Sequence, residues 1–242
     1  QIRYPDKFGI KDKLRRGLSQ SSEFFELTLE SYKILSFLLN EKLTVTESLK
    51  LNHNISIFEH QLRAAHKVKN EFGGSAMLSD EVGLGKTIEA GIIIKEFLVT
   101  GLAKKILILA PPSLLPQWQD EMKSKFDLEF INHKSDPRFI DVFSHDLLLM
   151  SHSSAVFPNY SKALESVFWD LVVVDEAHSM KNSQTKKHIL VRNLSKKNLL
   201  LLTATPVQNN LLELFNLVDL LQPGLLGTWK QFQEKYTYQQ QL

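Results

Sequence analysis

The 242-residue sequence contains no cysteine. Neither a disulfide framework nor a metal site built from thiolates is therefore possible. This absence fits a reducing compartment, and we expect a cytoplasmic protein. The sequence also lacks an apolar run near the roughly 18 residues of a membrane span. Residues 1–20 are rich in Lys, Arg and Asp and lack the apolar core of a signal peptide. We expect no membrane partner.

The sequence has no strong excess of either charge. It has 29 Lys and Arg against 27 Asp and Glu, a net charge of +2 and a pI near 8.6. Such a balance is compatible with nucleic acid but far too weak to argue for it. Hydrophobic residues make up 43%, which is ordinary for a globular protein and enough for a sizeable core. Because the chain begins at Gln1 rather than Met, we expect it to be a piece of a longer protein.

Residues 79–91, SDEVGLGKTIEAG, carry the signal around which we interpret the rest of the chain. They follow a small-residue run, 73–78, suited to a short buried strand, and lead into apolar residues at helical spacing over 88–99. A strand, a glycine turn ending in Gly-Lys-Thr and a helix together predict a phosphate-binding loop. Gly83 and Gly85 would let successive backbone N–H groups face the phosphate oxygens at the helix N-terminus.

The loop also predicts individual roles. Lys86 would reach the β- and γ-phosphates, and the Thr87 hydroxyl would ligate Mg²⁺. One position departs from the standard pattern, because the glycine expected five residues before Gly85 is Asp80. Taken alone, Gly-Lys-Thr is weak evidence, since a surface turn before a helix can carry the same residues.

The N-terminal part is predicted to be an extension. Residues 1–21 read as an irregular polar arm, residues 22–38 as a packed helix, and residues 41–54 as a connector. A second helix is predicted over 59–72. Its expected buried face is Leu62, Ala65 and Val68.

Short apolar segments separated by polar ones fill the second half of the chain. They lie at residues 105–110, 147–151, 171–174 and 199–202, with a shorter candidate at 128–131. Near-continuous Val, Ile and Leu indicates strands buried on both faces of a parallel sheet. Helical stretches at 114–126 and 185–194 alternate with them, which predicts an α/β fold with a parallel sheet. Ligands of such sheets bind beyond the carboxyl ends of the strands.

Two carboxylates follow one of these strands. Asp175 and Glu176 come directly after the apolar run 171–174, and His178 lies two residues further on. Asp175 would hold hydrated Mg²⁺, and Glu176 would orient and deprotonate the attacking water. A strand followed by an ordinary polar turn is the alternative, but it leaves the phosphate loop unexplained.

These motifs together resemble the Swi2/Snf2 family of superfamily 2 helicase-like ATPases over about residues 55–235. The resemblance includes Asp80 where other phosphate loops have glycine. The matching segments, in the family's order, are His60-Gln61, DEVGLGKT (80–87), ILAPPSLL (108–115) with Trp118, DEAH (175–178) with Lys181-Asn182, TATPVQNN (203–210), LELF (212–215) and Pro223-Gly224.

Within the family, the chain is most similar to the bacterial RNA-polymerase-associated branch. The segments that carry this similarity are Glu81-Val82, Glu89-Ala90-Gly91, His60-Gln61 and Thr203-Ala204-Thr205. Residues 207–210, VQNN, instead read like the broader family. The protein partner therefore stays open, with RNA polymerase or another DNA-bound complex as candidates.

The resemblance implies a parallel-sheet, RecA-like P-loop domain that binds ATP and Mg²⁺ and couples hydrolysis to movement along double-stranded DNA, remodelling protein–DNA complexes. We expect residues 1–52 to be an arm and helical extension and residues 53–242 to be helicase lobe 1. A second RecA-like lobe of the same protein would supply arginines to the γ-phosphate. It would follow Leu242, so we expect this lobe alone to be nearly inactive.

The resemblance also implies a set of nucleotide-binding residues. They are Gln61, Asp80, Glu81, Val82, Gly83, Leu84, Gly85, Lys86, Thr87 and His178. Gln61 has an acceptor and donors suited to the edge of adenine, although a surface amide near a helix start is the plain alternative. His178 could bridge the carboxylate site to Thr203 or Thr205, or could simply be solvated.

Nucleic-acid contacts are predicted at two strand ends. Pro112 and Ser113 follow one strand, and Ser151 and His152 follow another, where a hydroxyl and a helix start can meet a phosphate. We expect Trp118 to be a core or interface residue rather than a base-stacking one.

Two other functions remain open from the sequence. One is the motor subunit of a restriction or phage-defence system. The other is a nucleotide-dependent binding module without turnover, against which the presence of Lys86, Thr87, Asp175 and Glu176 argues.

Overall fold

The computed structural model describes residues 43–50, 55–79, 85–204 and 211–238. The chain divides into two compact units, residues 1–41 and 42–242, and every described residue belongs to the second. The predicted arm and first helix, the loop residues 80–84 and residues 205–210 lie outside the described residues.

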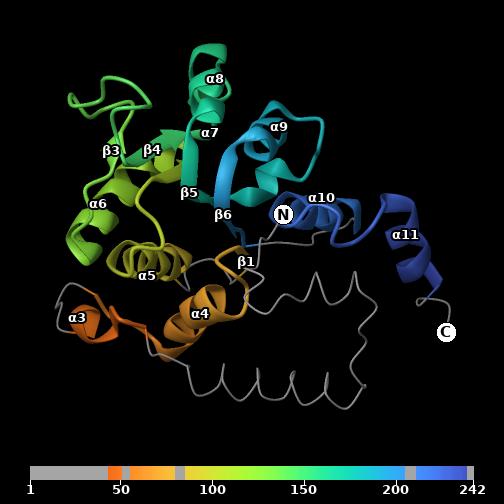
Figure 1. Cartoon of the computed structure of the whole chain (residues 1–242), viewed down its shortest axis with the longest axis horizontal. Coiled ribbons are helices and arrows are strands. Elements are labelled where there is room, and N and C mark those ends of the chain that lie inside the picture. The colour runs from red at the N-terminus through yellow and green to blue at the C-terminus, as the bar shows by residue number, and fades with distance from the viewer. Residues whose placement is uncertain (1–42, 51–54, 80–84, 205–210, 239–242) are drawn as a thin grey trace, which may run out of the picture. The chain divides into compact units, whose positions relative to one another are not determined.

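Strands of the described residues form one parallel sheet in the order β1-β6-β5-β2-β4-β3 (Figure 1). Every neighbouring pair is parallel, which confirms the predicted α/β fold with a parallel sheet. The strands are β1 (Ala76–Leu78), β2 (Ile106–Ala110), β3 (Ile131–Asn132), β4 (Leu147–Ser151), β5 (Phe168–Val174) and β6 (Ser195–Leu202).

Helices connect the strands and continue beyond the last of them. The α-helices are α3 (Thr46–Lys50), α4 (Glu59–Asn70), α5 (Lys86–Val99), α6 (Leu115–Phe126), α7 (His152–Ala155), α8 (Pro158–Ser166), α9 (Lys186–Asn193), α10 (Leu211–Leu221) and α11 (Trp229–Tyr238). Two 3-10 turns, η1 (Pro112–Leu114) and η2 (Ala177–Met180), directly follow the ends of β2 and β5. No helix in this part of the chain is long and apolar enough to span a bilayer.

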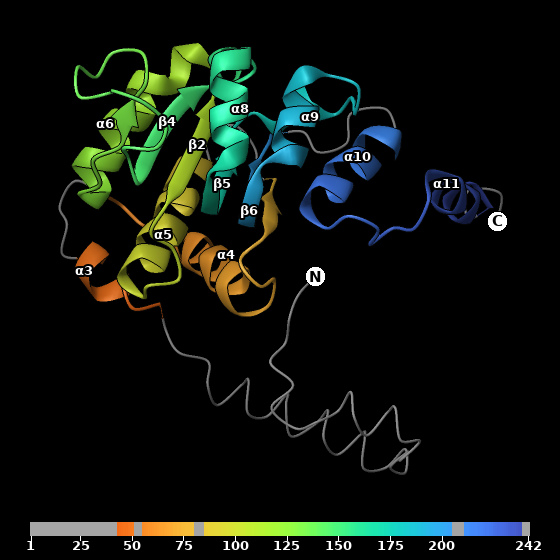
Figure 2. The same cartoon turned by 45° about the horizontal axis from the view of Figure 1, so that its top comes forward.

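The sheet is buried on both faces, because successive side chains of a strand point to opposite sides. In β2, Ile106 and Ile108 belong to the hydrophobic core that includes residues of α4, α5 and α6. Leu107 and Leu109 belong to a second core, which includes residues of α8, α9 and α10. Figure 2 shows α8 and α9 on the opposite side of the sheet from α5. The near-continuous apolar strands of the sequence reflect this three-layer packing.

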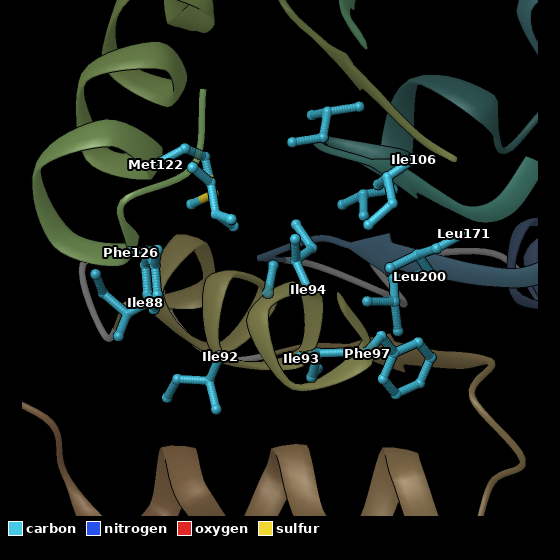
Figure 3. Close-up of a cluster of buried hydrophobic side chains, with 14 of the residues drawn as sticks. Ile88, Ile92, Ile93, Ile94, Phe97, Ile106, Met122, Phe126, Leu171 and Leu200 are labelled. Carbon is cyan, nitrogen blue, oxygen red and sulfur yellow. The ribbon is translucent and has the colours of Figure 1, made fainter. Parts of the chain in front are cut away.

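Helix α5 is the most completely buried of the covering helices. Ile92, Ile93 and Ile94 are successive residues, yet each is at most 1% exposed. A helix that is apolar on all sides must be enclosed on all sides. Figure 3 shows Met122 and Phe126 of α6 beside α5, with apolar side chains of the sheet on another side. The helix that begins at the phosphate loop is thus held rigidly against its neighbours.

Residues 43–50 pack as part of the second unit, although we predicted a connector there. Leu43, Val45 and Leu49 are buried in the same core as α5. The backbone N–H of Val45 also donates to Glu96 Oε2 of α5 at 3.1 Å. Because apolar side chains alternate with polar ones here, the sequence alone did not reveal this packing. The compact lobe therefore begins before residue 53.

Parallel pairing brings the carboxyl ends of the strands to one edge of the sheet. The residues that follow these ends are the ones in which we predicted chemistry. Among described residues they are Gly85 beyond β1, Pro112 and Ser113 beyond β2, His152 beyond β4, Asp175 and Glu176 beyond β5, and Thr203 beyond β6.

Candidate functional site

The described end of the phosphate loop is Gly85, the N-cap residue of α5. Its φ of 89° and ψ of 35° lie in the left-handed region, which glycine adopts without steric cost. A Cβ at this position would also lie 2.5 Å from Gln61 Nε2. The left-handed conformation therefore favours glycine here, and a Cβ would also force the end of the Gln61 side chain to shift. The predicted ligands Asp80, Glu81, Val82, Gly83 and Leu84 lie outside the described residues.

Gln61 is a buried residue at the start of α4, not the surface amide that we considered as an alternative. It is 2% exposed, and its Oε1 accepts the backbone N–H of Phe58 at 3.0 Å. This hydrogen bond caps the helix by satisfying a backbone donor near its N-terminus. The amide oxygen is thus engaged within its own helix, while Nε2 lies toward Gly85. Gln61 joins α4 to the edge of the phosphate loop.

Lys86 and Thr87 form the first turn of α5, and both are half-buried. Lys86 lies close enough to Asp175 for its positive charge to act on the pKa of that carboxyl group. Burial raises the pKa of Asp175, and Lys86 opposes that effect together with two hydrogen-bond donors. Lys86 at the start of α5 thus lies within electrostatic range of Asp175, which follows β5.

Asp175 is 8% exposed, and each of its oxygens has a hydrogen-bond donor. Oδ2 accepts the indole N–H of Trp118 at 2.8 Å, and Oδ1 accepts the backbone N–H of Glu176 at 2.8 Å. A carboxylate has about four lone-pair positions, so further acceptor capacity remains on both oxygens. Two donors fix the carboxylate plane and leave it able to accept from metal-bound water.

These residues fit Mg²⁺ held through oxygen. Mg²⁺ usually binds through one or two carboxylates plus phosphate oxygens and waters, not through a cage of protein ligands. Within the described ranges there is no group of three or more His, Asp or Glu that could hold a metal ion by itself. Asp175 and the Thr87 hydroxyl would be the protein's contribution. Phosphate oxygens and waters would supply the remaining ligands.

Glu176 occupies a strained backbone position at the start of η2. Its φ and ψ are both 49°, in the left-handed region that non-glycine residues rarely adopt. Such strain costs on the order of 1–3 kcal/mol and clusters at functional sites. The turn leaves the Glu176 side chain 36% exposed, with Oε2 lying 3.0 Å from His178 Nδ1. Asp175 faces inward, and Glu176 faces an accessible space.

Thr203 is fully buried, and its backbone N–H donates to the carbonyl of Leu78 at 3.0 Å. This bond joins the carboxyl ends of β6 and β1 directly before the phosphate loop. Thr205 lies outside the described residues. A link from His178 to Thr203 stays a prediction; within the described residues, His178 contacts Glu176.

The predicted nucleic-acid residues separate into two groups by exposure. Pro112 and Ser113 are exposed in η1. Ser151 is 1% exposed and His152 is 3% exposed, so neither side chain presents a surface to a nucleic-acid backbone in this structure. A polar pair after a buried strand indicated a surface turn, but α7 folds His152 inward.

His152 instead supports the backbone at Asp175 through a carbonyl that both residues contact. Its Nε2 lies 3.0 Å from the carbonyl of Leu109, which also accepts the backbone N–H of Asp175 at 2.8 Å. Burial lowers the pKa of His152 to about 4, so the ring is neutral at physiological pH and Nε2–H donates to that carbonyl. His152 thus joins the ends of β4, β2 and β5.

Trp118 lies in the core, as we predicted, with 1% of its surface exposed. Its hydrogen bond to Asp175 was not predicted. The two residues are 57 positions apart, and neither motif contains a local signal that they meet. Only the packing of α6 against the sheet reveals the contact.

Comparisons with protein families and curated proteins agree on the kind of protein that this chain resembles. A family model described as the SNF2-related domain matches residues 60–241. The chain is 42% identical over 234 residues to the uncharacterized ATP-dependent helicase YqhH of Bacillus subtilis, an alignment covering 97% of this chain and 41% of that protein. It is 32% identical over 239 residues to the RNA polymerase-associated protein RapA of Erwinia tasmaniensis, covering 93% of this chain and 24% of RapA.

Solved structures give the same result for the fold. The SWI2/SNF2 ATPase core of Sulfolobus solfataricus in complex with dsDNA matches with a TM-score of 0.67 and 28% identity, covering 76% of this chain and 39% of that one. The core domain from the same organism matches with a TM-score of 0.64 and 28% identity, covering 78% and 40%. The chain spans less than half the length of each of these relatives.

Proposed function

The chain belongs to the SNF2-related domain family, and on this premise we propose that it is the ATP-binding lobe of a double-stranded DNA translocase that remodels protein–DNA complexes. The observation that carries the proposal is the convergence of Lys86 and Asp175 at one edge of the sheet, with Glu176 beside them. A cation at a helix start opposite a strand-end carboxylate suits the binding of nucleotide phosphates.

Each residue of the site has a separate role in ATP binding and hydrolysis. Lys86 binds the β- and γ-phosphates, and Thr87 and Asp175 hold the ion. Mg²⁺, when bound, supplies charge neutralisation to the phosphates during transfer. Glu176 accepts the proton of the attacking water, because its side chain follows β5 beside Asp175 and is 36% exposed. Gln61 lines the side of the site where the adenine would lie.

His178 is placed to respond to the state of Glu176. Its Nδ1 lies 3.0 Å from Glu176 Oε2, so the proton that Glu176 takes from water changes the charge next to the imidazole. We propose that His178 passes this change toward Thr203 and Thr205, which follow β6. Thr203 already ties β6 to the strand preceding the phosphate loop.

Duplex DNA is the proposed substrate of movement, and contact is assigned to the exposed turn η1. Pro112 and Ser113 present a hydroxyl and backbone groups without a base-reading side chain. Contacts of this kind position a protein on the phosphate backbone and carry no sequence information. A matched Sulfolobus structure contains dsDNA, and a matched relative is RNA polymerase-associated, so RNA polymerase is a candidate protein partner.

A second RecA-like lobe of the same protein is part of the proposal. In enzymes of this class an arginine supplied across the cleft contributes about 10³–10⁵ in rate. We therefore expect this lobe alone to bind Mg·ATP weakly and to hydrolyse it near background. DNA would accelerate hydrolysis only by favouring closure of the two lobes.

The test is phosphate release with and without duplex DNA at low salt, where backbone contacts are strongest. We expect near-background release from residues 1–242 and DNA-stimulated release from the longer protein that carries them. Robust DNA-stimulated hydrolysis by residues 1–242 would contradict the need for a second lobe. ATP binding without hydrolysis in the longer protein would favour the binding-module alternative.

A further inference from the structure

We infer that Trp118 is the positioning residue of Asp175, holding the carboxylate in the orientation that receives Mg²⁺ with the nucleotide. This inference rests on the proposed function and concerns that same site. Trp118 does not touch the nucleotide or the ion in this assignment. It acts through one hydrogen bond, from its Nε1–H to Asp175 Oδ2 at 2.8 Å.

The geometry makes this hydrogen bond specific. An indole N–H is a donor only, so it can restrain an acceptor without competing for a proton or a metal. Oδ1 of the same carboxylate accepts the backbone N–H of Glu176, which is presented by the left-handed turn at that residue. With one donor on each oxygen, rotation of the carboxylate about its own axis breaks a hydrogen bond. The remaining acceptor positions of Asp175 therefore keep a fixed direction.

Burial makes the restraint strong. Trp118 is 1% exposed and Asp175 is 8% exposed, so water does not readily replace the indole as donor. A hydrogen bond to an ionised acceptor in such surroundings is shorter and stronger than one between neutral groups. Groups that orient metal-ligating side chains in this way typically change metal affinity or activity 10–100-fold when they are removed.

A second buried tryptophan shows what a purely structural indole looks like in this fold. Trp169 of β5 is fully buried, and its Nε1–H donates to the backbone carbonyl of Leu164 at 3.0 Å. That bond satisfies a buried donor near the end of α8 and involves no side chain of the site. Trp118 could have been satisfied in the same manner by a backbone carbonyl. Its donor instead reaches the strand-end carboxylate from another helix.

The experiment compares Trp118→Phe with Trp169→Phe in the 242-residue chain. Each change keeps an aromatic ring in the core and removes one buried N–H. Titration calorimetry measures ATP binding at a series of Mg²⁺ concentrations, and thermal unfolding is recorded for each variant. We expect the half-saturating Mg²⁺ concentration to rise about tenfold or more in Trp118→Phe and to stay unchanged in Trp169→Phe. Both variants should lose some stability.

The outcomes separate the inference from the proposed function. If the unchanged chain shows no Mg²⁺-dependent ATP binding, the proposed function fails. If the unchanged chain binds and Trp118→Phe shows the same Mg²⁺ dependence, the positioning role alone is overturned. If both variants lose stability and neither changes the Mg²⁺ dependence, Trp118 has a packing role only.

A measurement on the unchanged chain covers the case in which Trp118→Phe does not fold. The chain has 3 tryptophans, so ¹⁵N-indole labelling gives three N–H resonances, assigned with Trp169→Phe and Trp229→Phe. Addition of Mg²⁺ to the ATP-bound chain should shift the Trp118 resonance and leave that of Trp169 in place. A Trp118 resonance that does not move while the chain binds Mg·ATP would overturn the inference.

Discussion

The ring of Phe126 lies directly over Gly91, at the crossing of α6 and α5. A Cβ on Gly91 would overlap the outer atoms of that ring, and Phe126 is only 2% exposed, so relieving the overlap would require a shift within the packed core. The contact sets how closely the two helices approach. α5 begins at Lys86 and α6 carries Trp118. The contact between Phe126 and Gly91 therefore also sets the spacing between these two residues of the site.

Gly91→Ala should destabilise the chain despite the better helix propensity of alanine. Overpacking a core costs about 1–3 kcal/mol. The gain from replacing a helical glycine is about 1 kcal/mol at most. We expect a net loss of about 1 kcal/mol in the free energy of unfolding, measured by urea denaturation. Combining the change with Phe126→Leu should cost less than the sum of the two single variants. A more stable Gly91→Ala chain would show that the ring moves freely.

Lys86→Ala should abolish measurable Mg·ATP binding with little loss of stability. The residue is half-buried in the first turn of α5 and faces the site, so its removal takes away the phosphate-binding charge without opening the core. Lys95→Ala, on the same helix, is the matched control and should bind like the unchanged chain. Calorimetric titration is the measurement. Unchanged affinity in Lys86→Ala would disprove its phosphate-binding role.

Glu176→Gln should separate nucleotide binding from hydrolysis. The amide keeps the size of the side chain but cannot accept the proton of the attacking water. In the longer protein with both lobes, we expect ATP to bind normally and turnover to fall by about 10²–10⁴. Phosphate release and calorimetry measure the two properties separately. Turnover near that of the unchanged protein would mean that another residue is the base.

Glu96→Gln should destabilise the lobe far more than removal of a surface carboxylate. Glu96 is fully buried in α5, and its Oε1 accepts a hydrogen bond from Lys69 Nζ at 2.7 Å. Breaking a buried pair leaves a charge uncompensated and costs about 3 kcal/mol. Glu129→Gln, which removes an exposed partner of Lys123, should have little effect. Denaturant unfolding of both variants is the comparison, and equal effects would refute this account.

Stability should decrease as the pH falls below about 6.5, partly through His188. Burial lowers the pKa of His188, although its hydrogen bond to the Met180 carbonyl opposes the effect; Arg192 also lowers it, and Asp219 raises it. A lowered folded pKa means that the unfolded chain takes up the proton first, so this contribution is present above 6.5 and lost below it.

His188→Asn should make the decrease between pH 7 and pH 5 shallower, because an amide can keep the bond to Met180 without titrating. His60→Asn, at an exposed position of α4, is the control and should leave the slope unchanged. Chemical denaturation across this pH range measures both slopes. An unaltered slope in His188→Asn would assign the acid sensitivity to other groups.

The strands were predictable where their apolar runs are bounded by polar residues. The bounds 147–151 match β4, whose neighbour Asp146 is exposed. We predicted the starts of β5 and β6 too late. Asp170 interrupts the apolar run of β5, and Lys196 precedes the apolar run of β6. Asp170 Oδ2 accepts the backbone N–H of Lys105 at 2.8 Å, and Lys196 Nζ donates to the Val191 carbonyl at 2.7 Å. The first partner lies 65 positions away and the second only five, and both satisfy a polar side chain within a strand. Our sequence-based prediction did not name the helices α8, α10 and α11.

The site was predictable to the extent that strand ends define it. Lys86, Asp175 and Glu176 lie at the expected edge, because parallel strands bring their carboxyl ends together. The inward fold of His152 and the role of Gln61 as a helix cap depend on local turns that residue types do not specify. Motifs therefore indicated the position of the candidate site, while packing decided which polar side chains face it.

The pairing of β1 with β6 has a consequence for synthesis of the chain. Leu199 donates its N–H to Ser75 Oγ at 3.0 Å across 124 positions, and Ala76 pairs with Leu200 in the sheet. At about 5–20 residues per second, a ribosome needs about 6–25 s to make the intervening segment. During that time β1 has no partner among the strands that the structure describes, so this edge of the sheet is not yet formed. The edge of the sheet at β1 is therefore completed only after Asp175 and Glu176 have been made.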